Sequence, residues 1–85
     1  MTPLESRIIA IAEQLSGVEA HRDSRLVEDL SLDSLDRIQL AIDVERAFNI
    51  VIPDADVDNP ALGTIAGLAN YVERRIRYQR RGVEL

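Results

Sequence analysis

Several residue types that often carry chemistry are scarce or missing in this sequence. Its 85 residues include no cysteine, no tryptophan, one histidine and one methionine. Without cysteine, the chain can form no disulfide, thiol nucleophile or zinc-finger pattern. No apolar run approaches the ~18 residues of a membrane-spanning helix, and the first residues do not resemble a secretory signal. We therefore expect a cytoplasmic protein that is not an integral membrane protein.

The composition that remains is that of a small globular protein. Hydrophobic residues make up 46% and charged residues 29% of the chain, which is ordinary for a folded domain. We expect residues 1–85 to form one domain. A domain of this size buries only about 60% of its unfolded surface, so it has little room for a deep enzymatic pocket.

The spacing of apolar residues predicts an all-α fold. Residues recurring at three- and four-residue intervals indicate helices over 3–16, 34–48 and 64–79, and a short helix over 54–58. We expect Thr2, Asp54 and Thr64 to cap three of these helices. Three further features are predicted. The first helix ends at Gly17, and residues 50–52 form a buried extended connector. Residues 18–33 form a long loop held by Leu26, Val27 and Leu30.

The triplet Asp33-Ser34-Leu35 begins the second predicted helix. Asp and Ser are residues that accept hydrogen bonds from the first N–H groups of a helix. A hydroxyl at this junction can face solvent. A phosphate joined to it would lie by the positive end of the helix, a preference of about 0.3–1 kcal/mol. The position therefore suits a covalently attached group.

The second predicted helix has a wider apolar face than a small core requires. One arc is suited to the core and consists of Leu40, Ala41, Val44, Ala47 and Phe48. A neighbouring stripe consists of Leu35, Ile38 and Ile42. This stripe is either a docking surface for other proteins or a second part of the core, and periodicity alone leaves both interpretations open.

Several motifs together resemble the acyl carrier proteins. The matching positions are Leu-Val-Glu-Asp-Leu at 26–30, Asp-Ser-Leu-Asp at 33–36, Glu45, Phe48 and Ile-Pro-Asp at 52–54. Asp-Ser-Leu alone is a weak signal, whereas its flanks at this spacing make a specific one. The resemblance implies a four-helix bundle of three longer helices and one short helix. It also implies that Ser34, between Asp33 and Leu35, carries 4'-phosphopantetheine as a covalent cofactor.

The resemblance further implies a carrier that is not itself an enzyme. Its partners would be a phosphopantetheinyl transferase and acyltransferases, ketosynthases or acyl ligases with basic docking patches, in fatty acid, specialised lipid or polyketide biosynthesis. The implied docking residues are Asp36, Ile38, Ile42 and Glu45. The implied acyl-pocket residues are Leu40, Val44, Ile52, Leu62 and Leu68. Arg37 departs from the family pattern near the expected entrance of an acyl chain. An aminoacyl or peptidyl carrier of the same fold is an alternative.

Charge is unevenly distributed along the chain. Between positions 26 and 60 there are nine acidic residues and only two arginines, Arg37 and Arg46. Such an acidic lobe attracts basic partners and increases association rates. The arginines that end the last helix are Arg74, Arg75, Arg77, Arg80 and Arg81. We interpret them as solvated residues that offset the helix dipole and expect no nucleic-acid binding, since no other basic face exists. We also expect a monomer.

Three other functions are less consistent with the sequence. His21 with Ser34 and Asp33 could suggest a hydrolase, but there is no Gly-x-Ser-x-Gly elbow. The acidic alternation over 54–58 resembles a calcium loop, but Asn59 and Ile65 occupy the positions that require Gly and Glu. We therefore predict no dedicated metal site. A helical adaptor, in which Ser34 only caps a helix, remains an alternative.

Overall fold

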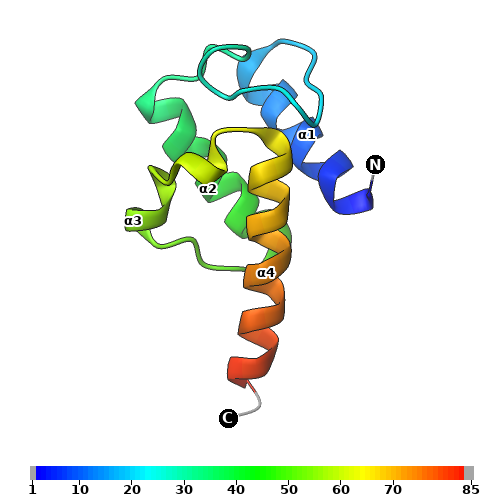
Figure 1. The fold of residues 1–85 in the computed structure, drawn as a ribbon, viewed down its shortest axis with the longest axis vertical. Helices are drawn as coiled ribbons and strands as arrows, with labels where there is room; N and C mark the ends of the chain where they lie inside the picture. The colour runs from blue at the N-terminus through cyan, green and yellow to red at the C-terminus, as the bar shows by residue number, and fades with distance from the viewer. Residues whose placement is uncertain (1, 84–85) are drawn as a thin grey trace.

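Four α-helices and one turn of 3-10 helix make up the fold of the computed structural model. They are α1 (Pro3–Ser16), α2 (Ser34–Phe48), α3 (Asp54–Val57), η1 (Pro60–Leu62) and α4 (Ile65–Val83). The structure describes residues 2–83, and only the backbone of residues 80–83. The connector between α1 and α2 arches over one end of the bundle, and the last turns of α4 extend beyond the other helices (Figure 1). This is the helical bundle that the sequence predicted.

Capping boxes begin the first two long helices. Thr2 accepts a hydrogen bond from the Glu5 backbone N–H at 3.1 Å, and the Glu5 carboxylate accepts one from the Thr2 N–H at 3.1 Å. Gly17 ends α1 in the left-handed conformation, with φ of 72°. This conformation favours glycine. Asn49 ends α2 in the same way, with φ of 55°.

The core lies where α1, α2 and α4 meet beneath the long connector. Its most completely buried large side chains are Ile8, Leu30, Leu32, Val44, Ile65 and Val72. Of the arc of α2 that was expected to face the core, Leu40 and Val44 are buried, whereas Ala41, Ala47 and Phe48 are partly buried. Val27 was expected to hold the connector in place. That prediction was wrong, because its side chain is 50% exposed.

Backbone hydrogen bonds join the long connector to the start of α4. The carbonyl oxygens of Ser24 and Arg22 accept hydrogen bonds from the N–H groups of Ile65 and Ala66, at 3.1 and 2.8 Å. A helix otherwise leaves its first N–H groups without partners. The expected Thr64 cap is also present, since its hydroxyl accepts from the N–H of Gly67 at 3.0 Å. The connector is therefore an integral part of the bundle.

The segment between α2 and α4 differs from its prediction in three respects. Ile50 and Ile52 are buried, as expected of a buried connector, but Val51 is 60% exposed because extended chain turns alternate residues outward. Asp54 does not cap α3, since Pro53 occupies the cap position without a side-chain hydrogen bond. The 3-10 turn η1 was not predicted at all.

Helix α4 runs to Val83, four residues beyond its predicted end. On this helix Arg77 pairs with Glu73 at 2.7 Å, and the Arg75 guanidinium lies 5.1 Å from the centre of the Tyr78 ring. These contacts hold the two arginines to the helix surface. The side chains of Arg80 and Arg81 lie outside the described part of the chain. Between residues 2 and 83, no helix combines the length and apolar character needed to cross a membrane.

Candidate functional site

Ser34 is the first residue of α2, and its hydroxyl is not what caps the helix. The cap is Asp33, whose carboxylate accepts a hydrogen bond from the Asp36 N–H at 2.8 Å. The Asp36 carboxylate accepts one in return from the Asp33 N–H at 3.3 Å. Ser34 is exposed. The serine hydroxyl therefore faces solvent at the positive end of a helix whose first turn is held by a capping box.

The apolar stripe beside Ser34 lies largely on the surface. Leu35 is 75% exposed and Ile38 is 49% exposed, whereas Ile42 is partly buried. Of the two interpretations that the sequence left open, burial in the core therefore does not hold for Leu35 and Ile38. Large apolar side chains grouped in one exposed patch are typical of interaction sites.

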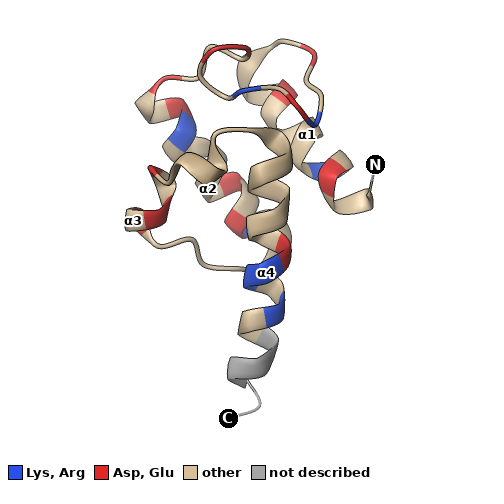
Figure 2. Cartoon of the chain, in the orientation of Figure 1, with Lys and Arg blue, Asp and Glu red and all other residues tan. Residues whose placement is uncertain are grey.

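Acidic residues surround the same end of the molecule. They lie on the connector before α2, at the start of α2 and on α3, with some basic residues among them on the connector and α2, and further basic residues lie along the second half of α4 (Figure 2). Among the predicted docking residues, Glu45 has a structural contact that was not foreseen. Its carboxylate accepts a hydrogen bond from the Ile52 N–H at 2.7 Å and so fixes the connector that follows α2.

A surface groove begins at Ser34 and runs between α2 and α3. It has a volume of about 570 Å³ and is lined on the α2 side by Ser34, Arg37, Ile38, Ala41, Ile42 and Glu45. A smaller cavity of about 110 Å³ lies deeper, between α2, η1 and the start of α4. Five residues line both spaces: Arg37, Ala41, Ile52, Val57 and Asp58. The groove and the cavity are therefore adjacent spaces that share one wall.

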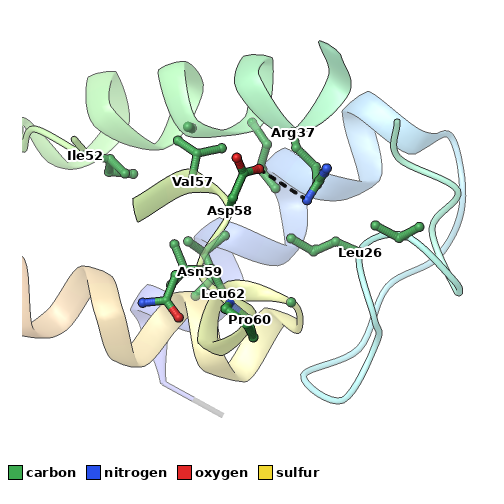
Figure 3. Close-up of a pocket in the computed structure, with 13 residues that line it drawn as sticks. Leu26, Arg37, Ile52, Val57, Asp58, Asn59, Pro60 and Leu62 are labelled. Atoms are coloured by element: carbon green, nitrogen blue, oxygen red, sulfur yellow. Dashed lines mark ion pairs between the residues drawn. The ribbon is translucent and has the colours of Figure 1, made fainter. Parts of the chain in front are cut away.

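Four of the five expected acyl-pocket residues line the deeper cavity. These are Leu40, Ile52, Leu62 and Leu68, and Figure 3 shows the cavity with its lining side chains. Val44, the fifth, is completely buried and lies outside the set of lining residues. The reason is geometric, since Val44 follows Leu40 by one helical turn and packs into the centre of the bundle.

Arg37 and Asp58 face each other where the groove meets the cavity (Figure 3). Arg37 Nη1 lies 4.0 Å from the Asp58 carboxylate, the two side chains being 31% and 85% exposed. The Arg37 Nε is buried, and within the described part of the chain it has no hydrogen-bond partner. A buried donor without a partner costs about 1–3 kcal/mol. The unusual arginine was visible in the sequence, but its pairing with Asp58 was not.

Helix α3 is held to α4 by one side-chain hydrogen bond. The Tyr71 hydroxyl donates to the Asp56 carboxylate at 2.5 Å. Burial, and then this carboxylate, raise the pKa of Tyr71 to about 12. Both causes disfavour the phenolate, because it would be desolvated and beside another negative charge. Fifteen residues separate the two partners, and no sequence pattern joins them.

The alternating acidic residues of α3 and its C-cap contact different partners. Asp56 accepts from Tyr71, and Asp58 faces Arg37. Among residues 2–83, no group of three or more His, Asp or Glu side chains is arranged to hold a metal ion. His21 is an exposed residue of the long connector and does not line the groove that contains Ser34.

Comparison with known proteins gives consistent results. A family model described as the phosphopantetheine attachment site matches residues 6–72. An acyl carrier protein of Campylobacter curvus is 39% identical over 66 residues, which cover 75% of this chain and 83% of the relative. One from Helicobacter hepaticus is 36% identical over 75 residues, covering 86% and 96%. One from Thermotoga maritima is 28% identical over 74 residues, covering 84% and 89%. The residues that line the groove and the cavity all fall within the matched span.

Proposed function

Because this chain belongs to the acyl carrier proteins, whose domain is the attachment site of phosphopantetheine, we propose that Ser34 is the residue that carries the arm. The observation that supports this most directly is the division of roles at the start of α2. Asp33 caps the helix, so the neighbouring hydroxyl is available for modification. An adaptor in which Ser34 serves only as a cap does not agree with this geometry.

The residues around Ser34 fit such a group. A phosphodiester on its hydroxyl would lie at the N-terminus of a helix, where negative charge is favoured. The rest of the arm would lie in the groove, whose α2 side includes Ile38, Ala41 and Ile42. When attached, the arm supplies a terminal thiol that holds acyl groups as thioesters. The protein is a carrier and not an enzyme, and Ser34 would be the substrate of a separate transferase.

We further propose that the cavity shelters an acyl chain between visits to partner enzymes. Its lining is apolar on the α2, η1 and α4 sides, through Leu40, Leu62 and Leu68. Burial of each methylene contributes about 0.8 kcal/mol, so even a short chain favours entry. The cargo belongs to fatty acid, specialised lipid or polyketide assembly in this proposal. An aminoacyl cargo is the alternative.

The docking surface of the proposal comprises Leu35 and Ile38, with Asp33 and Asp36 at its rim. Two exposed apolar side chains provide contact area, and the carboxylates attract a basic partner. Ile42 lies further along the groove and contributes at its edge. Contacts of this size are weak and sensitive to salt, as suits a carrier that must release each partner quickly.

The attachment site is tested by mass spectrometry. The protein is incubated with coenzyme A, magnesium and a broad-specificity phosphopantetheinyl transferase, and we expect a mass gain of one arm. Ser34→Ala should gain nothing, whereas Ser6→Ala should be modified like the wild type. Ser6 is a matched control because it is also an exposed serine near the start of a helix. Unmodified wild-type protein, correctly folded, would refute the proposal.

The docking surface is tested with the same transferase as the partner. Ile38→Glu should lower kcat/KM about fivefold to tenfold, the effect of losing one interface contact worth more than about 1 kcal/mol. Val51→Glu is the control, because Val51 is a comparably exposed apolar residue in the connector that follows α2. Equal rates for both variants, with unchanged melting temperatures, would remove Ile38 from the docking surface.

A further inference from the structure

The second half of α4 carries more positive charge than its structural role explains. Residues 73–85 contain five arginines and two glutamates, a net charge of +3, in a protein whose net charge is −5. Arginines near the C-terminus of a helix offset its dipole, but this effect is confined to the last turn. Because α4 runs to Val83, Arg74, Arg75 and Arg77 lie too far from its end to serve that purpose.

Three exposed side chains form one face of this half of α4. Arg74, Arg77 and Tyr78 are spaced by three and four residues, which places them on the same side of the helix. All three are exposed, and Tyr78 is 65% exposed although it is a large aromatic residue. The sequence continues the same spacing with an arginine at position 81. We refer to Arg74, Arg77 and Tyr78 as the basic face.

The charges of the basic face are available to a partner. Arg77 pairs with Glu73 but is still 70% exposed, and within the described part of the chain Arg74 has no ion-pair partner. The Arg75 guanidinium lies 5.1 Å from the centre of the Tyr78 ring, a cation–π contact that helps to hold the ring in place. The basic face therefore combines guanidinium groups with an exposed aromatic ring.

The basic face and the acidic lobe lie towards opposite ends of the molecule. The last turns of α4 extend beyond the other helices, whereas α2 begins near the other end, where acidic residues predominate (Figures 1 and 2). The longest dimension of the molecule is 41 Å, and charges are screened over about 8 Å at physiological ionic strength. An anionic surface in contact with the end of α4 is therefore only weakly repelled by the acidic lobe.

We infer that the basic face is a docking site for an anionic phospholipid surface, to which the protein binds peripherally. Guanidinium groups bind phosphates through paired hydrogen bonds, and tyrosine has the apolar ring and polar hydroxyl that are favoured at the level of lipid headgroups. A bilayer is flat, so it can contact the protruding helix alone. Nucleic acid fits less well, because domains that bind it are basic as a whole, whereas residues 1–72 have a net charge of −8, from five arginines and thirteen acidic residues.

This docking site is separate from the proposed function and does not depend on modification of Ser34. A protein bound through α4 presents the start of α2 away from the bilayer. The acidic lobe then remains accessible to enzymes with basic patches. The lipid surface and a partner enzyme can therefore be bound at the same time.

Sedimentation with lipid vesicles tests the inference on the full chain. One set of vesicles is pure phosphatidylcholine, and the other contains equal parts of phosphatidylcholine and phosphatidylglycerol, both at physiological ionic strength. Each charge near an anionic surface changes binding about fivefold, so a net charge of +3 should raise the partition coefficient about 100-fold on the anionic vesicles. Salt at about 1 M should remove this difference, because it shortens the screening length to about 3 Å.

A matched pair of variants assigns the binding to the basic face. Arg77→Gln and Arg25→Gln each remove one charge and one ion pair between residues four positions apart, from side chains that are 70% and 60% exposed. Arg25 lies in the long connector, at the other end of the bundle (Figure 1). Arg77→Gln should lower the partition coefficient about fivefold, and the double variant with Arg74→Gln about 25-fold. Arg25→Gln should leave it unchanged.

The outcomes that contradict the inference are distinct from those that concern the carrier function. Equal losses for Arg77→Gln and Arg25→Gln, in variants with unchanged circular dichroism, would mean that the net charge of the molecule governs binding and would overturn the inference. Equal binding to both kinds of vesicle would overturn it as well. So would tighter binding to duplex DNA or to poly-glutamate, at the same concentration of negative charge, than to the anionic vesicles. Ser34→Ala should bind vesicles like the wild type, so none of these results bears on the attachment of the arm.

Discussion

Two stretches of irregular chain border the helices of this protein, and they are held in different ways. The connector between α1 and α2 buries Leu26, Leu30 and Leu32 and is joined by backbone hydrogen bonds to the start of α4. The segment between α2 and α4 buries Ile50, Ile52 and Leu62 on either side of α3, but no residue of α3 itself is buried. Irregular chain can therefore be as firmly held as a helix, provided that it carries its own apolar anchors and satisfies the backbone of its neighbours.

The contacts that hold α3 are few and come mainly from side chains. Tyr71 donates to Asp56, and Arg37 lies at the limit of ion-pairing distance from Asp58. A hydrogen bond contributes a net of about 0.5–1.5 kcal/mol, and an exposed ion pair about 0–1 kcal/mol. Burial of three leucines in the connector contributes considerably more to the free energy of folding than these two contacts.

This difference has a functional consequence, because Val57 of α3 and the following Asp58 belong to the wall shared by the groove and the cavity. Segments with little apolar burial open with the smallest free energies. Displacement of α3 would widen the passage from Ser34 without disturbing the connector or the start of α4. The protein is therefore expected to be rigid where Ser34 is positioned and compliant at the wall between the groove and the cavity.

The largest effect should come from removing an anchor of the connector. Leu30 is 1% exposed, and Leu30→Ala should lower the free energy of unfolding by about 2–5 kcal/mol through lost burial and the remaining cavity. Val57 of α3 is only partly buried, so Val57→Ala should cost about 1 kcal/mol. Urea denaturation of both variants measures the difference. Equal losses would mean that α3 is anchored as firmly as the connector.

A smaller loss is expected where α4 touches η1. A Cβ placed on Gly67 would lie only 2.0 Å from the Ala61 carbonyl oxygen. Gly67→Ala should therefore destabilise the protein by about 1–3 kcal/mol, even though alanine is the better helix former by about 1 kcal/mol.

Asn70→Ala is the control for this variant, since Asn70 is exposed on the next turn of the same helix. Its effect should stay within about 0.5 kcal/mol. Thermal unfolding followed by circular dichroism measures both. A stabilised Gly67→Ala variant would show that η1 moves away at little cost, and the compliant region would then extend to the start of α4.

Local sequence patterns predicted α1, the connector and the start of α2 well. Helical periodicity and capping residues act within a few residues of one another, so Thr2, Gly17 and the start of α2 could be placed from the sequence. Leu26 and Leu30 of the connector were also identified, whereas the equally buried Leu32 was not. Val27 was not placed correctly, because its exposure depends on how the connector folds back over the bundle.

The region around α3 depends on contacts between residues that are distant in the sequence, and periodicity does not reveal such contacts. Arg37 and Asp58 are 21 positions apart, and Tyr71 and Asp56 are 15 apart. Neither pair lies on a common helix, and η1 is too short to show a period. The cavity exists because these segments meet, so its outline followed from family resemblance, whereas its polar entrance required the structure.

The smallest effect on stability should come from removing the single side-chain hydrogen bond between α3 and α4. Tyr71→Phe should lower stability by about 1 kcal/mol at neutral pH. In hydrogen exchange, the amides of α3 should exchange faster while those of the connector stay unchanged. Tyr78→Phe is the control, because Tyr78 is 65% exposed. Faster exchange in both segments would mean that they open together and that the contrast between them does not exist.

The pH dependence of this bond gives the sharpest form of the test. The folded protein raises the pKa of Tyr71 to about 12 from an ordinary value of 10, so the folded state holds the phenolic proton more tightly than the unfolded state. The resulting stability is fully present below pH 10 and is lost as the pH rises from 10 to 12. Wild type and Tyr78→Phe should therefore lose stability across this window, whereas Tyr71→Phe lacks the titrating group and should lose less. Denaturant midpoints measured from pH 9 to 12 provide the comparison. Parallel curves for all three proteins would show that Tyr71 does not hold α3, and the compliance of this wall would then need another cause.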